Sequence, residues 1–497
     1  MKIERHFTTV KGGAYAGIKF RKTSSAIHNL DGSTASEFDG ITVPEGWSQT
    51  ATDILAQKYF RRAGVPSKTK PVPEKGVPSF LKRHKADDAA LAKINSKKRF
   101  TGETDARQVF DRMAGTWGYW GWKNGYFSGP SDAAAYVDEM SYMLASQIGA
   151  PNSPQWFNTG LHWAYGIDGP AQGHFYADEK TGKATPATSA YERPQPHACF
   201  IQSVSDDLVG DNGIFDLWQR EARLFKFGSG TGTNFSTLRG EGEALSGGGQ
   251  SSGLISFLRI GDIAAGAVKS GGTTRRAAKM VIVDIDHPDV EEFIHWKAKE
   301  EQKVATLVVG SRLLDKHLNK VLAACADAEA GDAPFDPKQN ELLKQAIRAA
   351  KIDAIPDTML KRALQWASQG YTELSLETFS TDWDSASYRS VFGQNANNSI
   401  RINDDFLAAV EQDKDWALTA RVDGGVHKTV KANELWQGIV EASWLCADPA
   451  VQYHDTINDW HTCAADGQIR GSNPCSEYMF LDDTACNLAS LNLKKFI

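Results

Sequence analysis

The 497-residue sequence predicts an α/β fold in which a mostly parallel sheet or barrel follows a helical region. Two observations lead to this prediction. Over residues 105–195, apolar residues recur at spacings of three and four, which is typical of amphipathic helices. From Cys199 onward, short apolar stretches alternate with helical patterns, and such units place parallel strands in one sheet.

Three regions follow from these patterns. Residues 1–104 mix short strand-like stretches with a Pro/Lys-rich passage over 64–85, which we interpret as a surface connector. Residues 105–195 form the helical domain. Residues 196–497 form the α/β part, and within them residues 322–385 are helical and polar, as expected of a peripheral insertion.

The α/β part predicts its own strands and helices. The short apolar stretches predict strands over 199–204, 281–283, 304–309 and 399–402. The amphipathic stretches predict helices over 213–227 and 254–269, and one that begins near 288–291. Gly228 should end the first of these helices, and Asn403 should cap a further helix that begins near Phe406.

Composition and charge exclude several classes of protein. With 55 Lys and Arg against 61 Asp and Glu, the net charge of -6 gives no basic footprint for nucleic acid. No apolar run approaches the roughly 18 residues that span a bilayer. The N-terminus has no apolar signal core. We therefore expect a cytoplasmic protein that binds neither nucleic acid nor membrane.

The cysteines are too sparse to form a disulfide scaffold in a chain of this size. They stand at six positions, Cys199, Cys325, Cys446, Cys463, Cys475 and Cys486. No CxxC pair occurs, which argues against a zinc ribbon or a thioredoxin-type site. Any function of these thiols must therefore come from their placement.

The segment around Cys475 carries the most informative arrangement. Pro474 biases Asn473 towards an extended conformation, in which alternate side chains point the same way. Asn473, Cys475 and Glu477 would then share one face, with an amide to orient, a thiol to react and a carboxylate to move a proton. A turn with incidental polar residues is the alternative, and spacing alone leaves both open.

Three segments together resemble the active-site elements of the large subunit of ribonucleotide reductases, in the same order along the chain. They are PHACF at 196–200, NPCSE at 473–477 and TACNLASLNL at 484–493. Further resemblances lie in APNSP at 150–154, FNTG at 157–160, GSGTG at 228–232 and QNANNSIR at 394–401. The likeness covers about 105–497, and the preceding residues resemble the extension of bacterial cobalamin-dependent members.

The resemblance implies the family's ten-stranded α/β barrel, here as its first half and the finger loop over 470–480. A second half-barrel, with a phosphate-binding segment and a cysteine tail, would be missing. The chain is then expected to be a fragment, a truncated gene product or one piece of a split enzyme. It should be inactive without a C-terminal half-barrel as partner.

The resemblance also implies the reduction of ribonucleotides to 2′-deoxyribonucleotides for DNA synthesis. Cys475 would remove the 3′-hydrogen as a thiyl radical, Glu477 would accept the 3′-hydroxyl proton, and Asn473 would hold the substrate hydroxyls. Cys199 and Cys486 would deliver a proton and reducing equivalents and end as a disulfide.

Nucleotide contacts are implied in the same way. Substrate contacts map to Ser153, Ala198, Cys199, Gly230, Asn473, Pro474, Cys475, Ser476 and Glu477. Contacts to a deoxynucleotide effector map to Asp206, Arg239, Gly271, Gly272, Thr273, Thr274, Arg275 and Arg276. For each effector loop, a solvated surface loop is the alternative.

The implied cofactor is adenosylcobalamin, whose cobalt–carbon bond is the radical source. No residue of the chain is assigned to the cofactor, and no protein ligand set for a metal is predicted. The implied partners are the substrate, the effector and a thioredoxin-like reductant, and a homodimer is compatible with the resemblance. A diphosphate and a triphosphate substrate both remain open.

The sequence leaves two other functions as alternatives. An iron–sulfur or metal protein could use His461, Cys463, Cys475 and Cys486, but these spacings are long and irregular for a cluster motif. A non-catalytic nucleotide-binding fragment could keep the effector loops without the chemistry. Deoxynucleotide binding that is not accompanied by reduction would favour the second alternative.

Overall fold

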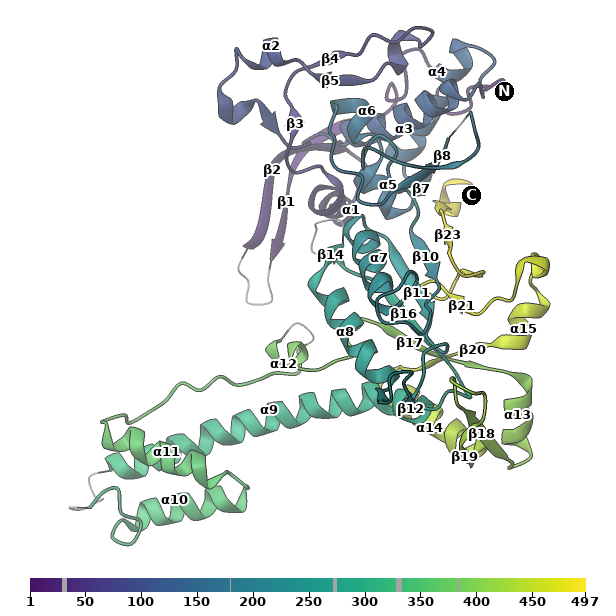
Figure 1. The fold of residues 1–497 in the computed structure, drawn as a ribbon. Coiled ribbons are helices and arrows are strands. Elements are labelled where there is room, and N and C mark those ends of the chain that lie inside the picture. The colour runs from purple at the N-terminus through teal and green to yellow at the C-terminus, as the bar shows by residue number, and fades with distance from the viewer. Residues whose placement is uncertain (29–33, 179, 271–274, 328–332, 383–384) are drawn as a thin grey trace. The chain divides into compact units, whose positions relative to one another are not determined.

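The computed structural model describes residues 1–497 except 29–33, 179, 271–274, 328–332 and 383–384. The chain folds as two compact units (Figure 1). The first unit contains residues 1–238, 264–282 and 454–497, and the second contains 239–263 and 283–453. The strands and helices that carry the predicted thiol and finger-loop residues all belong to the first unit.

The N-terminal part of the first unit is built mainly from strands. They are β1 (Phe20–His28), β2 (Thr34–Pro44), β3 (Val65–Pro66), β4 (Thr69–Pro71), β5 (His84–Ala86) and β6 (Phe100–Thr101), with helices α1 (Gln49–Ile54) and α2 (Asp88–Leu91). A π-helical turn over Leu55–Tyr59 follows α1. The passage over 64–85 is more than the predicted surface connector, because Val77 and Leu81 are buried against aromatic side chains of the next helices.

A helical region follows, as the sequence predicted. Its helices are α3 (Ala106–Lys123), α4 (Pro130–Ala145), α5 (Ser153–Asn158) and α6 (Leu161–Tyr165). Asp105 begins α3 with a capping box, in which its side chain accepts from the first turn and Gln108 bonds back. The apolar face of α3, with Phe110 and Met113 fully buried, packs into the core beside α5.

Four neighbouring strands make up the part of a six-stranded sheet that matters for the site (Figure 1). They are β10 (Cys199–Gln202), β11 (Gly230–Asn234), β16 (Lys279–Asp284) and β23 (Thr484–Cys486). Strand β11 lies parallel to both β10 and β16, whereas β23 pairs antiparallel with β10. This arrangement brings a C-terminal strand next to a strand nearly three hundred residues earlier in the chain.

Helix α7 (Ile214–Lys226) connects β10 and β11, as the sequence predicted. Its buried residues Ile214, Leu217 and Phe225 recur at helical spacing and form its apolar face. The helix ends before Gly228, whose φ of 93° is a left-handed conformation that favours glycine.

The remaining elements of the first unit are short. They are β7 (Gly149–Pro151), β8 (Phe175–Ala177), β9 (Ala184–Pro186), β14 (Lys269–Ser270), β15 (Arg275–Arg276), α15 (His454–Asp459), β21 (Gly471–Ser472), β22 (Met479–Phe480) and β24 (Ala489–Leu491). Among them, four antiparallel pairs lie outside the sheet: β7 with β24, β8 with β9, β14 with β15, and β21 with β22. Helix α8 (Leu254–Ala267) begins in the second unit and ends in the first.

Most of the strands and helices predicted for the residues of the second unit are present. This unit contains β12 (Glu241–Ala244), β13 (Gln250–Ser252), α9 (Val290–Ala326), α10 (Glu341–Ile352), α11 (Asp357–Ser368), α12 (Ala386–Arg389), β17 (Asn397–Ile402), α13 (Asp404–Glu411), β18 (Asp415–Thr419), β19 (Val426–Lys431), α14 (Ala432–Cys446) and β20 (Ala450–Tyr453). The predicted Asn403 cap is present, since its side chain accepts from the Phe406 amide at 2.9 Å.

One predicted strand is wrong. Residues 304–309 lie inside α9, which runs without a break to residue 326. Val304 and Val308, four residues apart, are both buried on one side of this helix, so a short apolar run concealed a helical period. The insertion predicted over 322–385 includes α10 and α11, which share a core with the C-terminal half of α9.

The expected half-barrel appears as an open arrangement, since the strands of the described residues do not close into a barrel. None of the helices found among the described residues is both long and apolar enough to cross a bilayer.

Candidate functional site

A row of three residues crosses the sheet of the first unit. Cys486 on β23 is the register partner of Cys199 on β10, and Cys199 is in turn the partner of Gly230 on β11. Directly opposed residues in an antiparallel pair have Cα atoms about 4.5–5.5 Å apart, within the span of a disulfide. Two predicted redox thiols from distant parts of the chain therefore meet, and both are buried and reduced in the structure.

The predicted finger loop is a hairpin rather than an extended segment. Strands β21 and β22 pair antiparallel, and the Asn473 amide donates to Tyr478 O at 3.0 Å. Ser476 has a φ of 64°, and its amide donates to Asn473 O at 3.2 Å, which closes a turn. The prediction that Asn473, Cys475 and Glu477 alternate along an extended backbone is thus wrong. The turn is favoured over the extended conformation because its main-chain N–H and C=O groups form hydrogen bonds within the hairpin.

The hairpin lies directly on β11. A Cβ atom on Gly230 would stand 2.5 Å from Pro474 Cγ, and one on Gly232 would stand 1.8 Å from Ser472 O. These glycines are two residues apart in a strand and therefore face the same side of the sheet. That side is also the side of Cys199, because Cys199 and Gly230 are cross-strand neighbours. The glycines explain how the loop approaches the thiols so closely.

Asn473 and Glu477 reach Cys199 from this hairpin. Cys199 Sγ lies 3.9 Å from Glu477 Oε1 and is oriented to donate to it. Asn473 is fully buried, and its Oδ1 accepts from the Tyr478 amide at 3.0 Å. Its Nδ2 is buried without a hydrogen-bond partner in the described part of the chain.

The two buried thiols are held in their protonated form. Burial raises the pKa of Cys199 to about 12, with further contributions from Cys486 and Glu477, while the Asn473 side chain opposes the rise. Burial also raises the pKa of Cys486, and Glu477 adds to that rise. Both residues are therefore donors of hydrogen rather than thiolate nucleophiles at neutral pH.

Cys475 differs from both. It is exposed at the turn of the hairpin, as is Glu477, whereas Asn473 and Pro474 are buried against the sheet. A thiol at this position is accessible to a reactant outside the sheet. The structure thus separates one accessible thiol from a pair of buried ones.

The sequence did not predict a buried ion pair on the other face of β11. Lys279 Nζ lies 2.5 Å from Glu221 Oε2, and Thr231 Oγ1 donates to Glu221 Oε1 at 3.0 Å. The ammonium also lies 4.1 Å from the centroid of the Trp218 ring. Thr231 stands between Gly230 and Gly232, so this pair supports the strand opposite the hairpin. A charged residue inside a strand, beside the helix that carries Glu221, was the available signal.

The predicted substrate residues Ala198 and Ser153 lie near the thiol pair or on strands that continue from it. The Ala198 amide donates to Cys486 O at 3.1 Å, and Ala198 O accepts from the Gly230 amide at 2.7 Å. Strand β24 continues from Cys486 and pairs with β7, which leads into Ser153 at the start of α5. Ser153 Oγ is 3.0 Å from the hydroxyl of Tyr59, a contact that the sequence did not predict.

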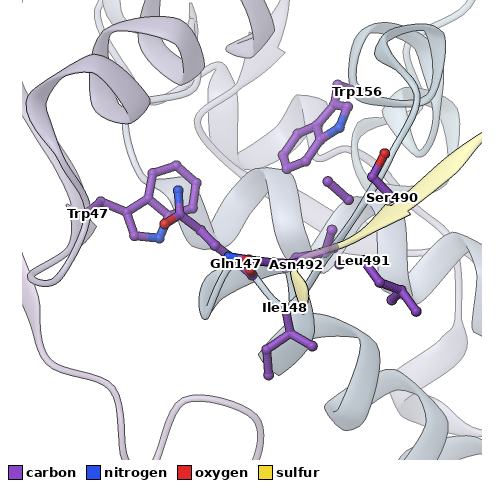
Figure 2. A pocket seen from close by; sticks show the side chains of 10 residues that line it. Trp47, Gln147, Ile148, Trp156, Ser490, Leu491 and Asn492 are labelled. Atoms are coloured by element: carbon purple, nitrogen blue, oxygen red, sulfur yellow. Dashed lines mark hydrogen bonds between the residues drawn. The ribbon is translucent and has the colours of Figure 1, made fainter. Parts of the chain in front are cut away.

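Two cavities flank the β7–β24 pair. One has a volume of about 250 Å³ and is lined by Trp47, Ile148, Trp156 and Leu491 among others (Figure 2). The other, of about 430 Å³, has Trp117, Tyr136 and Met140 in its lining. Their walls are mainly apolar, and none of the predicted catalytic residues belongs to either lining.

The predicted effector residues are divided between the two units and a segment outside the described residues. Asp206 is exposed in the loop after β10 of the first unit, whereas Arg239 belongs to the second unit and donates to Ala244 O at 2.8 Å. Arg275 and Arg276 form β15, which pairs with β14. Gly271, Gly272, Thr273 and Thr274 lie outside the described residues.

Residues of the alternative metal site have other contacts. Cys463 Sγ donates to Asp466 at 3.3 Å, and His461 Nε2 is 3.1 Å from Gly467 O. Among the described residues, no cluster of three or more His, Cys, Asp or Glu side chains could hold a metal ion.

A cysteine pair across adjacent strands, with a hairpin that carries a third thiol on the next strand, defines a thiol-bearing site in an α/β protein. Residues 197–497 match the model of the ribonucleotide reductase barrel domain, which is more than half of the chain. The chain therefore belongs to the ribonucleotide reductase family. Residues 21–147 match the model described as class II vitamin B12-dependent ribonucleotide reductase.

Relatives named vitamin B12-dependent ribonucleotide reductase match over the whole chain. The chain is 63% identical to a vitamin B12-dependent ribonucleotide reductase of Agrobacterium fabrum and 61% identical to one of Bradyrhizobium diazoefficiens. It covers 39% and 40% of those two proteins. A vitamin B12-dependent ribonucleoside-diphosphate reductase of Thermoplasma acidophilum is 25% identical over 74% of the chain, which covers 32% of that protein. The chain thus spans about two fifths of its first relatives' length.

Proposed function

We propose that this chain supplies the radical thiol and the redox thiols of a ribonucleotide reductase that makes 2′-deoxyribonucleotides. One observation carries the proposal: the hairpin with Cys475 lies on the face of the sheet where Cys199 and Cys486 are paired. Three thiols with two different environments match a reaction in which one thiol starts a radical and two provide electrons. The chain's membership in the family supports the same reaction.

The proposed steps balance in atoms and electrons. A thiyl radical on Cys475 takes the 3′-hydrogen atom of the ribose, while Glu477 accepts the 3′-hydroxyl proton. The C2′–O bond breaks, and a proton from the Cys199–Cys486 pair converts the leaving hydroxyl to water. The pair then passes a hydrogen atom to C2′ and one electron to C3′ and becomes a disulfide, and Glu477 returns its proton to the 3′-oxygen. Cys475 returns the hydrogen atom to C3′ and becomes the thiyl radical again.

The environment of each residue supports its proposed role. The raised pKa of Cys199 keeps its proton available to the leaving hydroxyl. The buried amide nitrogen of Asn473 has no oxygen partner within the described residues, so a substrate hydroxyl could complete its hydrogen bonding. Glu477 lies next to Cys199, so one carboxylate can serve both the substrate and the thiol pair.

Cobalamin, in its adenosyl form, is the proposed cofactor, in line with the class II model matched by residues 21–147. When bound, it supplies a radical from its cobalt–carbon bond. The residues fit this role in one respect, because the Cys475 thiol that must receive the radical is exposed rather than buried. We assign no residue of this chain to holding the cofactor.

We propose further features of this protein. They are the three-part layout 1–104, 105–195 and 196–497, a ribonucleotide substrate touching Ser153 and Gly230, and a deoxynucleotide effector near Asp206. A thioredoxin-like reductant would restore the thiol pair, and a C-terminal half-barrel would complete the enzyme. We also propose a homodimer and a cytoplasmic location.

A chimeric enzyme tests the proposal. This chain would replace the matching two fifths of the Agrobacterium fabrum relative, and the product would be assayed with adenosylcobalamin, dithiothreitol and ribonucleotides. We expect deoxynucleotide formation that Cys475→Ala abolishes together with 3′-hydrogen exchange. Cys199→Ser should stop multiple turnovers and leave exchange intact, and Cys325→Ser, in the insertion, serves as the matched control.

Two results would contradict the proposal. Deoxynucleotide formation that persists in the Cys475→Ala chimera would remove the radical role from this residue. Binding of nucleotides without any reduction, in a chimera whose parent enzyme is active, would instead favour a nucleotide-binding role without chemistry.

A further inference from the structure

The register of β23 decides whether the thiol pair exists. Strand β23 has three residues, and only three register pairs join it to β10. Because side chains alternate along a strand, a slip of one residue would turn Cys486 to the opposite face from Cys199. Its other residues, Thr484 and Ala485, are only half-buried and give this short strand little apolar anchoring. Contacts other than the β10–β23 strand pairing must therefore fix the register of β23.

Asp483, immediately before β23, is fixed to Ser203, immediately after β10. The Ser203 amide donates to Asp483 Oδ1 at 3.1 Å, and Ser203 Oγ donates to Oδ2 at 2.6 Å. Both carboxylate oxygens are thus held by one residue, and hydrogen bonds to a charged acceptor are stronger than neutral ones. Asp483 has a φ of 59°, a left-handed conformation that Asp tolerates better than most residues.

Arg220 of α7 strengthens this junction. Its Nη2 donates to Ser203 O at 3.1 Å, and its Nη1 lies 3.8 Å from Asp483 Oδ1. Its Nε donates to Asp216 Oδ2 at 2.9 Å, one turn earlier in the helix, which orients the guanidinium. The helix behind the sheet is therefore bonded to the end of β10 and faces the start of β23.

We infer that Asp483, Ser203 and Arg220 form a register lock for the thiol pair. They are positioning residues, since they act through β10 and β23 and not on a substrate. A carboxylate held by two hydrogen bonds at the end of the ladder permits one alignment, and in that alignment Cys486 faces Cys199. The inference rests on the proposed redox role of this pair.

The test uses the full 1–497 chain and needs no turnover. The chain is equilibrated with reduced and oxidised glutathione, and peptide mass spectrometry measures the Cys199–Cys486 disulfide. Each disulfide forms as glutathione disulfide accepts two electrons and becomes two glutathione thiols, which carry the protons. We expect Asp483→Ala to lower the equilibrium constant by roughly tenfold or more, the value of a lost charged hydrogen bond. Ser203→Ala and Asp483→Asn should have smaller effects in the same direction.

Three comparisons separate the lock from general damage. Asp211→Ala removes an exposed carboxylate from the neighbouring loop and should leave the constant unchanged. The alkylation rate of Cys475 should also stay the same in every variant. Asp483→Asn keeps the size of the side chain and its tolerance of the left-handed conformation, so it tests the lock if the alanine variant fails to fold.

The outcomes are distinct. Wild-type constants in both Asp483 variants would overturn the register lock. Failure of the unaltered chain to form a Cys199–Cys486 disulfide would instead overturn the proposed redox role.

Discussion

The carbonyl oxygen of Ser472 occupies the space that a side chain on Gly232 would need, since a Cβ there would stand 1.8 Å from it. The hairpin that carries Cys475 can therefore lie on β11 only because the strand has no side chain at that position. The contact between the hairpin and β11 therefore requires glycine at position 232, and this requirement can be tested.

Gly232→Ala should displace the hairpin. The obstacle is a main-chain oxygen, which cannot rotate away, so we expect the free energy of unfolding to fall by about 1–3 kcal/mol, as for other overpacked sites. The alkylation rate of Cys475 should change as its turn moves. Gly247→Ala is the control, because a Cβ there meets nothing within 4 Å. Equal unfolding curves for the two variants would show that the contact is absent in solution.

The thiols should differ in reactivity with pH. Because burial raises the Cys199 pKa from 9.0 to about 12, its thiolate fraction near pH 8 should be about a thousandfold below that of an unperturbed thiol. Iodoacetamide should thus modify Cys475 first, as followed by peptide mass spectrometry. The raised pKa also means that the contribution of Cys199 to stability is full below pH 9 and is lost as the pH rises towards 12. Equal labelling of Cys199 and Cys475 at pH 8 would contradict this picture.

Substitutions of the two residues in the buried ion pair, Glu221 and Lys279, should have strongly non-additive effects on the free energy of unfolding. Glu221→Gln or Lys279→Met alone leaves one buried charge without its partner and should cost about 3–5 kcal/mol of unfolding free energy. The double variant should cost less than the sum of the two, because neither charge then remains. Urea unfolding of all four proteins gives the coupling energy, and additive costs would mean that the two charges do not interact.

The insertion should respond to mutation on its own. Leu318 is fully buried in the core that α10 and α11 share with the end of α9. Leu318→Ala should cost about 2–5 kcal/mol locally, as for other large-to-small core changes. Hydrogen exchange should then accelerate in 341–368, while the Cys199–Cys486 disulfide forms as in the wild type. Loss of the disulfide in this variant would show that the insertion supports the site.

Much of the local structure was encoded in short stretches of sequence. The amphipathic period before Gly228 predicted α7, and the Asn403 cap was predicted from its residue type. Such features depend on neighbours within one turn or one strand, so the sequence displays them directly. The strand predicted over 304–309 is wrong because this short, mostly apolar stretch fits both the strand period and the helix period. Only the continuation of α9 on both sides decided between them.

The sequence by itself determined which side chains carry the proposed chemistry and the family to which the chain belongs. The tertiary structure decided how they meet: the pairing of Cys199 with Cys486, the turn that leaves Cys475 exposed, and the ion pair of Glu221 with Lys279. The reason is physical. Pairings between residues tens or hundreds of positions apart are set by strand register and by packing across the sheet, and neither leaves a local pattern in the sequence.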